Sequence, residues 1–456
     1  MKLFRRILWG LAIVLALMIA LALVFIRPVD YTPYFLKPYY KQTMKNLNDV
    51  GGALPVVQPA PVEVGFGKAS VTPPLGTPLA GYGDRHGKPS VGVHDSLFAR
   101  AFAIKAGNQE FVMVSGDFLL VPIQLADSVM ARIEPVLGLT REQILFSATH
   151  THSGPGAWGD TWLEGKFAGK YDPKILRFLA DQLSEAIVQA HNDLIPGEVG
   201  WDSFHAPALI RNRLVGKKGW TNDRATFTVF KQDDGDEGVL VSFGAHATVL
   251  PAENRLISAD YPGYLERKLE RKLTGVCAFF AGGVGSHRPV GTGSGFDRAR
   301  MIGETLADSV LAHIGTMPLH QNVSVLAIGL PVALPEYCIR VTDNLRLAPF
   351  LSEKILKERS TYFNMMVLGR EFFLGIPAEL SGEISLMLQA LADQKGYLLT
   401  QTSFNGSYVG YIVPGKYYHF KSYESRLMSF YGPYMGDYFE ELSRRLMGVA
   451  WKHVQP

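Results

Sequence analysis

The chain has 456 residues, of which 47% are hydrophobic and 19% charged, and its 45 Lys and Arg residues nearly balance 42 Asp and Glu residues. A formal net charge of +3 gives no indication of the basic surface typical of nucleic-acid-binding proteins. The aromatic content of 11% excludes an intrinsically disordered chain. Two cysteines, Cys277 and Cys338, are too few for a disulfide framework or an all-thiolate zinc site.

The N-terminus carries an uncharged apolar run, Ile7 to Ile26, that follows Lys2, Arg5 and Arg6. A helix of this length is about 30 Å long and can cross the hydrocarbon core of a membrane. We therefore expect residues 1–26 to be a signal anchor or transmembrane helix, with the rest of the chain outside the cytoplasm, in the periplasm or the extracellular space. A cleavable signal peptide is the alternative, because Ala20-Leu21-Ala22 offers a small-x-small cleavage site.

Residues 27–61 are rich in Tyr and Pro, and we expect them to form a tether. Aromatic residues beside a membrane helix often lie at the lipid interface, and a plain proline-stiffened linker is the alternative.

From residue 62 to residue 456, strand-like and helix-like patterns alternate, which favours one large mixed α/β domain. Short runs rich in β-branched and aromatic residues predict strands at 97–105, 111–115, 144–149, 226–231, 239–243, 276–280 and 323–331. Apolar residues at helical spacing predict helices at 172–192, 261–273, 296–314 and 379–394.

The strand at 144–149 runs into His150-Thr151-His152 and then into the turn Ser153-Gly154-Pro155-Gly156. In extended backbone, residues i and i+2 point to the same side, so both imidazoles face one space beyond the strand end. Ligand sites of α/β sheets usually lie at such ends, and neutral imidazole is the commonest metal ligand. Taken alone, the pattern is equally explained by two hydrogen-bonded histidines.

Three further segments place polar side chains after apolar runs. His246 follows the strand at 239–243, where a core histidine bonded to the backbone is the alternative. Glu379 follows the strand 371–375 and, with Pro377, is expected to open a helix, where the helix dipole would explain an acidic residue. The segment 405–411, NGSYVGY, is a glycine-broken turn with two tyrosines.

Taken together and in order, these segments resemble the neutral, non-lysosomal ceramidase family. The most specific match is 147–156, SATHTHSGPG, and looser matches surround it in the family's order. These are 66–74 (FGKASVTPP), 79–82 (LAGY), 93–95 (VHD) with 99–101 (ARA), 212–213 (NR), 245–246 (AH), 258–263 (SADYPG), 377–382 (PAELSG) and 408–412 (YVGYI).

The resemblance implies the fold of the ceramidase catalytic domain and one Zn²⁺ ion held by His150, His246, Glu379 and Tyr411. Two neutral imidazoles and one carboxylate leave positive charge on the metal, which lowers the pKa of a bound water towards about 7. His152 is implied as the general acid and base, Arg213 as a group that positions the substrate, and Tyr411 also as a group that contacts the substrate oxyanion.

The sequence departs from the family at 282–289, GGVGSHRP, where ceramidases carry Gly-Asp-x-Ser-Pro with an active-site serine. Ser286 stands at the aspartate position and Arg288 at the serine position, so serine-dependent chemistry is expected only if Ser286 takes that part. His287 is a further candidate, with a structural role as its alternative. Because the sequence ends at Pro456, we expect the immunoglobulin-like domain of full-length ceramidases to be absent.

We therefore expect a membrane-tethered, zinc-dependent hydrolase that cleaves an amide bond of a lipid-like or N-acylated substrate, as in sphingolipid metabolism. The same site acting on an ester or a cell-wall amide is one alternative, and a non-catalytic binding protein on the same fold is another. A barrel amidohydrolase is the alternative fold. We expect no nucleic-acid partner.

Overall fold

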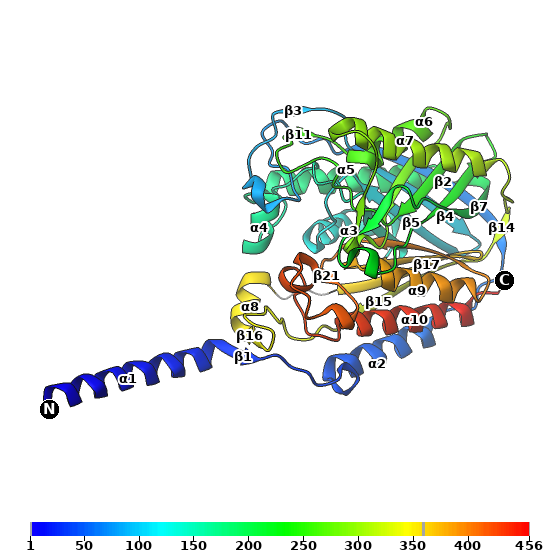
Figure 1. The fold of residues 1–456 in the computed structure, drawn as a ribbon. Coiled ribbons are helices and arrows are strands. Elements are labelled where there is room, and N and C mark those ends of the chain that lie inside the picture. The colour runs from blue at the N-terminus through cyan, green and yellow to red at the C-terminus, as the bar shows by residue number, and fades with distance from the viewer. Residues whose placement is uncertain (1, 358–360, 456) are drawn as a thin grey trace.

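The structure, a computed structural model, describes residues 2–357 and 361–455. Two β-sheets lie face to face, and helices cover the outer face of each sheet (Figure 1). The described chain therefore forms a four-layer α/β/β/α arrangement, which confirms the predicted mixed α/β class and differs from a barrel.

The larger sheet has nine strands in the order β12-β10-β9-β7-β2-β4-β5-β6, with β14 paired to β2. Most neighbours are antiparallel, whereas β6 runs parallel to β5 and β12 parallel to β10. Its strands are β2 (Ala60–Ser70), β4 (Phe98–Ala106), β5 (Gln109–Gly116), β6 (Ile144–Ala148), β7 (Ile195–His205), β9 (Arg224–Gln232), β10 (Glu237–Phe243), β12 (Cys277–Ala281) and β14 (Asn322–Val323).

The smaller sheet has the order β15-β17-β18-β20, and four strand pairs lie outside both sheets. Its strands are β15 (Val325–Val332), β17 (Thr361–Leu368), β18 (Glu371–Ile376) and β20 (Leu398–Ser403). The pairs are β1 (Ile26–Pro28) with β16 (Leu345–Leu347), β3 (Gly92–Val93) with β11 (Leu256–Ile257), β8 (Ile210–Asn212) with β13 (His287–Pro289), and β19 (Glu379–Leu380) with β21 (Tyr411–Ile412).

Apolar side chains fill the three spaces between these layers. Phe102 and Phe111 of the larger sheet and Phe373 of the smaller sheet belong to the core between the sheets. The larger sheet is covered by α3 (Ile123–Leu137), α5 (Pro173–Asn192), α6 (Asp260–Glu270) and α7 (Gly295–Ile314), and the smaller sheet by α2 (Pro38–Ala53), α9 (Gly382–Asp393) and α10 (Met435–His453). Two shorter helices, α4 (Trp162–Ala168) and α8 (Pro349–Leu356), lie at the left of Figure 1.

Glycines in β2 let α5 lie directly on the strand backbone. A Cβ atom added at Gly65 would lie 2.1 Å from the carbonyl oxygen of Ala190, and one added at Gly67 would lie 2.0 Å from that of Ala186. No side chain fits into so short a distance, so the close approach of helix and sheet requires glycine at these positions.

The predicted N-terminal helix is present as α1 (Lys2–Phe25), which extends away from the layered part of the chain (Figure 1). Among the helices in the described part of the chain, none combines the length and hydropathy needed to cross a membrane. The predicted transmembrane segment is therefore not confirmed.

Part of the predicted tether is a folded element. Residues Pro38–Ala53 form α2, whose Thr43 is fully buried and accepts a hydrogen bond from the hydroxyl of Tyr438 in α10. Leu47 of α2 joins the core beneath the smaller sheet. Apolar residues at helical spacing therefore outweigh the prolines and glycines that indicated a linker.

Glu379 differs from its predicted secondary structure. It lies in the short strand β19, and α9 begins only at Gly382, with Ser381 as the N-cap and Glu383 in the first turn. The helix dipole therefore acts on Glu383 and does not explain Glu379.

Candidate metal centre

His150 lies two residues beyond the end of β6 and is only 2% exposed. Its φ of 61° is in the left-handed region, which non-glycine residues rarely adopt. The Nδ1–H group donates a hydrogen bond to the carbonyl oxygen of Leu119 at 2.6 Å. This contact fixes the tautomer, so the lone pair of Nε2 points into the protein interior.

His246 reaches the same space from the segment after β10 and is 1% exposed. Its Nδ1–H group donates to the carbonyl oxygen of Val284 at 3.2 Å, and its Nε2 lies 2.8 Å from Nε2 of His150. Burial is the main cause that lowers the pKa of His246 well below its ordinary value. The Nε2 atoms of His150 and His246 therefore face each other across a buried space.

Glu379 completes this group from the smaller, opposite layer. Its Oε2 lies 3.6 Å from Nε2 of His150 and 3.5 Å from Nε2 of His246, and it has no hydrogen-bond partner among the described residues. Its Oε1 accepts a hydrogen bond from the hydroxyl of Tyr408 at 2.7 Å. One carboxylate oxygen is thus held by a tyrosine and the other faces the two imidazoles.

The three acceptor atoms fit a metal ion. Lone pairs of two imidazoles and a carboxylate repel one another in a buried space unless a cation lies between them. Nitrogen and oxygen ligands of tetrahedral zinc lie about 2.0–2.2 Å from the ion, so they are about 3.3–3.6 Å apart. The distances from Glu379 to the two imidazoles match this spacing, and the imidazole pair is closer.

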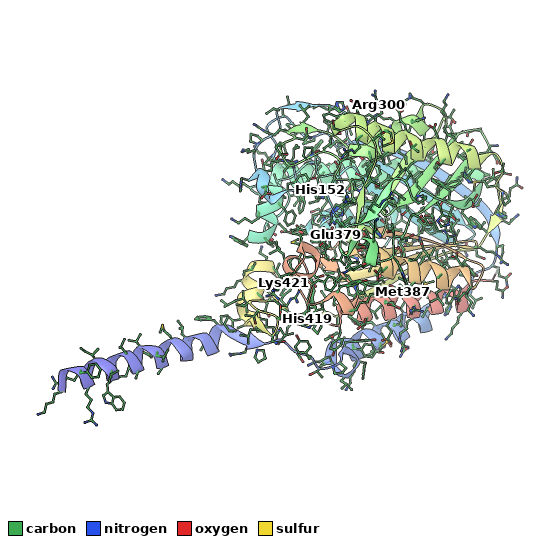
Figure 2. The ribbon with its side chains drawn as sticks, viewed as in Figure 1. His152, Arg300, Glu379, Met387, His419 and Lys421 are labelled. Atoms are coloured by element: carbon green, nitrogen blue, oxygen red, sulfur yellow. The ribbon has the colours of Figure 1, made fainter. Side chains whose placement is uncertain are left out.

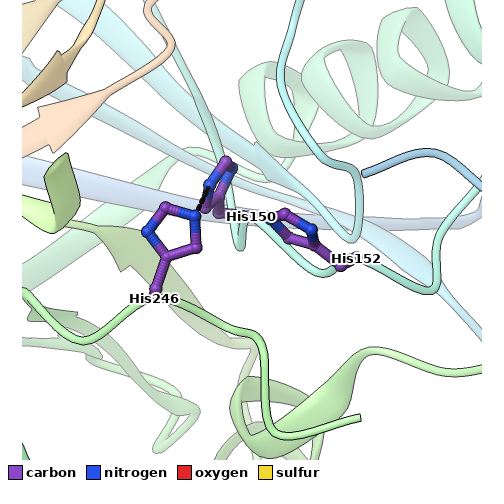
Figure 3. Close-up of side chains that lie close together, drawn as sticks. All are labelled: His150, His152 and His246. Carbon is purple, nitrogen blue, oxygen red and sulfur yellow. Dashed lines mark hydrogen bonds between the residues drawn. The ribbon is translucent and has the colours of Figure 1, made fainter. Parts of the chain in front are cut away.

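His152 faces the same space as His150 and His246, as the sequence pattern predicts (Figure 3). Ligand atoms of the three histidines all lie within 4.8 Å of one another, so a three-histidine site is a second possible ligand set. Neither ring nitrogen of His152 makes a well-formed hydrogen bond within the described chain. Burial, followed by the nearby His150, lowers the pKa of His152 well below its ordinary value.

Gly81 sets the position of the His152 ring. Its φ is +119°, and an added Cβ would lie 2.5 Å from Nδ1 of His152. The centre of the Tyr82 ring lies 4.7 Å from that of the His152 ring. The segment 79–82 therefore forms one wall of the site.

Tyr411 and Arg213 are also brought to the cluster. Tyr411 pairs with Glu379 in the β19–β21 register, and its ring is stacked at 6.4 Å from that of His246. Arg213 donates a hydrogen bond to the Tyr411 hydroxyl at 3.0 Å and pairs with Glu424 at 2.8 Å. Burial, followed by the charge of Glu379, raises the pKa of Tyr411 well above its ordinary value.

Ser286 lies in the turn η5 (Val284–Ser286) and is fully buried. Its hydroxyl accepts hydrogen bonds from the backbone N–H of Gly382 at 3.0 Å and from the hydroxyl of Ser381 at 3.2 Å. The same turn supports the cluster, since Val284 accepts the bond from His246 and a Cβ at Gly285 would lie 2.3 Å from the carbonyl oxygen of Glu379. The structure therefore places Ser286 behind the ligands, at the start of α9.

The two neighbours of Ser286 differ in exposure. His287 is fully buried and accepts a hydrogen bond from the backbone N–H of Asn222 at 3.3 Å, which favours the structural alternative for this residue. Arg288 is exposed.

Sequence reasoning gave no separate role to Tyr408, Gly81 or the carbonyl groups of Leu119 and Val284. Tyr408 and Gly81 lie inside segments that carry the family resemblance, so those motifs could have indicated that both residues lie at the site. The two carbonyl groups have no side-chain signature and become visible only in the fold.

Comparison with known proteins identifies the family. Residues 62–285 match the family model described as "Neutral/alkaline non-lysosomal ceramidase, N-terminal". Neutral ceramidase of Pseudomonas aeruginosa is 28% identical over 271 residues, which cover 53% of this chain and 40% of that protein. Neutral ceramidase of Mycobacterium tuberculosis is 26% identical over 215 residues, which cover 43% of this chain and 34% of that protein. The matched regions thus span well under half of these relatives' lengths.

Solved structures show the same fold. A structure described as "Ceramidase complexed with C2" superposes with a TM-score of 0.73 at 20% identity, covering 87% of this chain and 76% of that one. The crystal structure of neutral ceramidase from Pseudomonas aeruginosa gives a TM-score of 0.70 at 22% identity, covering 86% of this chain and 75% of that one. This chain belongs to the neutral/alkaline non-lysosomal ceramidase family.

Proposed function

We propose that this chain is a zinc-dependent amide hydrolase that acts on a ceramide-like, N-acylated lipid. The observation that carries the proposal is the convergence of His150 Nε2, His246 Nε2 and the unpartnered Oε2 of Glu379 within 3.6 Å of one another. These residues would hold the ion, with Tyr411 as the fourth protein ligand of the set implied by the family resemblance. Zinc bound there would lower the pKa of a water molecule and polarise the amide carbonyl.

His152 supplies the proton transfers in this proposal. Because burial keeps its imidazole neutral at pH 7, a ring nitrogen accepts a proton as the water attacks the amide carbon. The resulting imidazolium then donates that proton to the leaving amine nitrogen. Neither ring nitrogen makes a well-formed hydrogen bond, although a backbone contact with Gly81 partly offsets the lowering of the His152 pKa.

Arg213 and Tyr411 stabilise the developing negative charge on the former carbonyl oxygen. The guanidinium orients the Tyr411 hydroxyl through their 3.0 Å hydrogen bond, and Glu424 holds the guanidinium in turn. A donor fixed before the reaction stabilises an oxyanion better than water does, since it does not reorganise.

A small cavity of about 40 Å³ adjoins the proposed ligands through Tyr408, whose hydroxyl contacts Glu379. Its lining combines apolar side chains, Leu163, Phe167, Leu334 and Phe430, with polar ones such as Gln124 and Thr161. The apolar part of this lining supports contact with a lipid-like substrate.

Metal analysis combined with activity tests this proposal. The purified full chain is expected to hold one zinc per chain, to cleave an N-acylsphingosine, to lose activity with a chelator and to recover it with zinc. The variants His150→Ala/His246→Ala and Glu379→Gln should lose both metal and activity, whereas His94→Ala, away from this cluster, should keep both. Full activity of the double variant would refute the proposal.

The altered segment 282–289 favours a second candidate, hydrolysis of an ester or of a cell-wall amide by the same site. A panel of N-acyl amides, esters and cell-wall peptides separates these reactions. Zinc binding without turnover on any of them would instead indicate a non-catalytic binding protein.

We further propose that the domain acts outside the cytoplasm, in the periplasm or extracellular space. The support is the basic flank Lys2, Arg5 and Arg6 before an apolar segment, which is typical of export signals and signal anchors. Reporter fusions after residue 61 test the location, and the mass of the mature chain distinguishes an anchor from a cleaved signal peptide. A reporter active only in the cytoplasm would refute it.

A further inference from the structure

Two segments beside the metal centre expose both basic and large apolar side chains. The first is 216–220, which includes the turn η4 (Gly216–Lys218), and the second is 416–427, which ends in the π-helical turn η7 (Tyr423–Leu427). We refer to these two segments as the rim. Trp220 is 57% exposed, Phe420 43%, Tyr423 50% and Leu427 66%. Side chains of this size are normally exposed singly, and a concentration of them marks an interaction surface.

Contacts join the two segments into one surface. The Nζ atom of Lys416 lies 5.6 Å from the ring centre of Trp220 and 4.8 Å from that of Tyr417. The Tyr417 ring in turn lies 5.1 Å from Phe420.

The rim reaches the metal centre through two residues. The exposed Tyr423 packs edge-on against Tyr411 with ring centres 5.7 Å apart, and Glu424 pairs with Arg213. A molecule bound on the rim therefore lies next to the groups proposed to act on the substrate.

The charge of the rim is basic. Lys217, Lys218, Lys416 and Lys421 are exposed, whereas the single acidic residue of the two segments, Glu424, is 6% exposed and paired with Arg213. Lys416 is paired with the buried Glu383, and among the described residues Lys217, Lys218 and Lys421 have no ion pair. A partner with a dense negative charge complements this surface.

The rim also adjoins the base of α1. His419 stacks on Tyr31 with ring centres 6.2 Å apart, and Arg426 pairs with Asp343 at 2.7 Å, beside β16. Figure 2 places His419 and Lys421 on the side of the molecule from which α1 leaves. Most described large apolar side chains of α1 are themselves about half exposed or more.

We propose that the rim docks onto an anionic lipid surface, with its lysines at the phosphate groups and with Trp220, Phe420 and Leu427 in the interfacial region. Basic residues alternating with aromatic and aliphatic ones are the composition that binds such surfaces. An acidic protein would complement the lysines but would leave the four exposed apolar side chains without an apolar phase. This inference extends the proposed function, because docking would bring a lipid substrate to the site, but docking itself requires no turnover.

Hydrogen–deuterium exchange of the full chain tests the proposal. Because α1 exposes its own apolar side chains and could bind vesicles by itself, the measurement must show which residues are protected. Vesicles of phosphatidylglycerol are expected to protect amides in 215–221 and 416–428, with protection lost at high salt and absent with phosphatidylcholine. Protection confined to residues 2–31, or equal with both lipids, overturns the proposal. Protection that rises with protein concentration without vesicles assigns the rim to a second copy and also overturns it.

Charge-reversal variants test whether the rim lysines are required for vesicle binding. Lys217→Glu/Lys218→Glu/Lys421→Glu should weaken vesicle protection of both segments by at least about tenfold in lipid concentration. The matched control Arg271→Glu/Lys272→Glu, at the end of α6 on the far side of the larger sheet, should leave protection unchanged, and thermal unfolding verifies that each variant is folded. Glu379→Gln should lose zinc but keep rim protection, which separates failure of docking from failure of the proposed function. Unchanged protection in the triple lysine variant overturns the proposal.

Discussion

Under the proposed function, single side chains around the candidate metal centre divide into those that hold a ligand and those that act on a substrate. Tyr408 belongs to the first group, because its hydroxyl binds the Glu379 oxygen that faces away from the imidazoles. Such contacts orient a ligating carboxylate and commonly contribute 10–100-fold to metal affinity, by analogy with other metal sites.

We predict that Tyr408→Phe weakens zinc binding by about 10–100-fold while the chain stays folded. The measurement is competition with a chromophoric chelator. Tyr434→Phe is the control, since the Tyr434 hydroxyl bonds to the backbone of Tyr31 outside this cluster. Equal zinc affinity of Tyr408→Phe and the original chain would contradict the role given to Tyr408.

The proposed function assigns His152 to the second group. We predict that His152→Gln lowers kcat by about 10²–10⁴-fold and leaves one zinc bound, as expected for a general acid and base that is not a ligand. Zinc content and kcat are measured on the same sample. Loss of the metal would instead show that the three histidines form the ligand set.

The sequence predicted which side chains lie together at the site better than it predicted the backbone structure that brings them together. His150, His246, Glu379, Tyr411 and Arg213 lie together, as the resemblance implied. The left-handed backbone of His150 could not be predicted, because the contact that accompanies it, with Leu119, comes from a different part of the chain. Glu379 was assigned to a helix because Pro377 and the following apolar residues resemble a helix start, whereas pairing with Tyr411 makes it a strand.

Among the elements, the contact between β2 and α5 leaves no room for a single added methyl group. The helix lies on the strand backbone at Gly67, where an added Cβ would meet a carbonyl oxygen at 2.0 Å. The backbone must move to admit even alanine, and overpacking of this kind typically costs about 1–3 kcal/mol.

We therefore predict that Gly67→Ala lowers the free energy of unfolding by about 3 kcal/mol, measured by urea denaturation. Gly448→Ala is the matched control. Gly448 lies inside α10 with no atom within 4 Å of an added Cβ, so alanine should raise stability by about 0.5–1 kcal/mol. A Gly67→Ala variant as stable as the original chain would contradict the close packing.

The same glycines help to explain why β2 was not predicted. The sequence Ala60–Ser70 contains two residues that are depleted in strands, Gly65 and Gly67, so its local pattern is weak. The strands predicted from β-branched runs, such as β9, β10 and β12, are present within a few residues of their expected ends. Local composition thus identified several of the regular strands and missed others, namely β2, β7, β17 and β20.

In the molecule as a whole, the two sheets enclose a carboxyl group. Glu371 is fully buried and accepts hydrogen bonds from Thr228 of the larger sheet at 2.8 Å and from Thr400 of the smaller sheet at 2.6 Å. Burial raises the pKa of Glu371 from 4.5 to about 8. The folded protein therefore keeps a proton that the unfolded chain releases between these pH values.

Because the folded state binds more protons in this range, stability from Glu371 is fully present below about pH 4.5 and falls as pH rises towards 8. We predict that the free energy of unfolding of Glu371→Gln, relative to the original chain, increases between pH 5 and pH 9 by a few kcal/mol, about 1.4 kcal/mol per pH unit at most. Urea denaturation at several pH values measures this difference. Glu134→Gln, on the exposed surface of α3, is the control, and parallel pH profiles for Glu371→Gln and the original chain would contradict the prediction.

The order of the two sheets could not be derived from the sequence. Strands such as β7 and β2, or β14 and β2, pair across long stretches of chain, and periodicity carries no information about distant partners. The mixed α/β class followed from alternation along the chain, and family membership followed from short motifs. The arrangement of the layers required the structure.

The pairing of β19 with β21 has a consequence for biosynthesis. The segment that matches the family model ends at residue 285 and contains the histidines, whereas Glu379 and Tyr411 are synthesised later and enter the site only through this pairing. A growing chain on the ribosome therefore contains the three histidines well before it contains Glu379. The proposed ligand set of His150, His246, Glu379 and Tyr411 is therefore complete only once translation has passed Tyr411, which makes metal loading after that point an expectation of the proposed function.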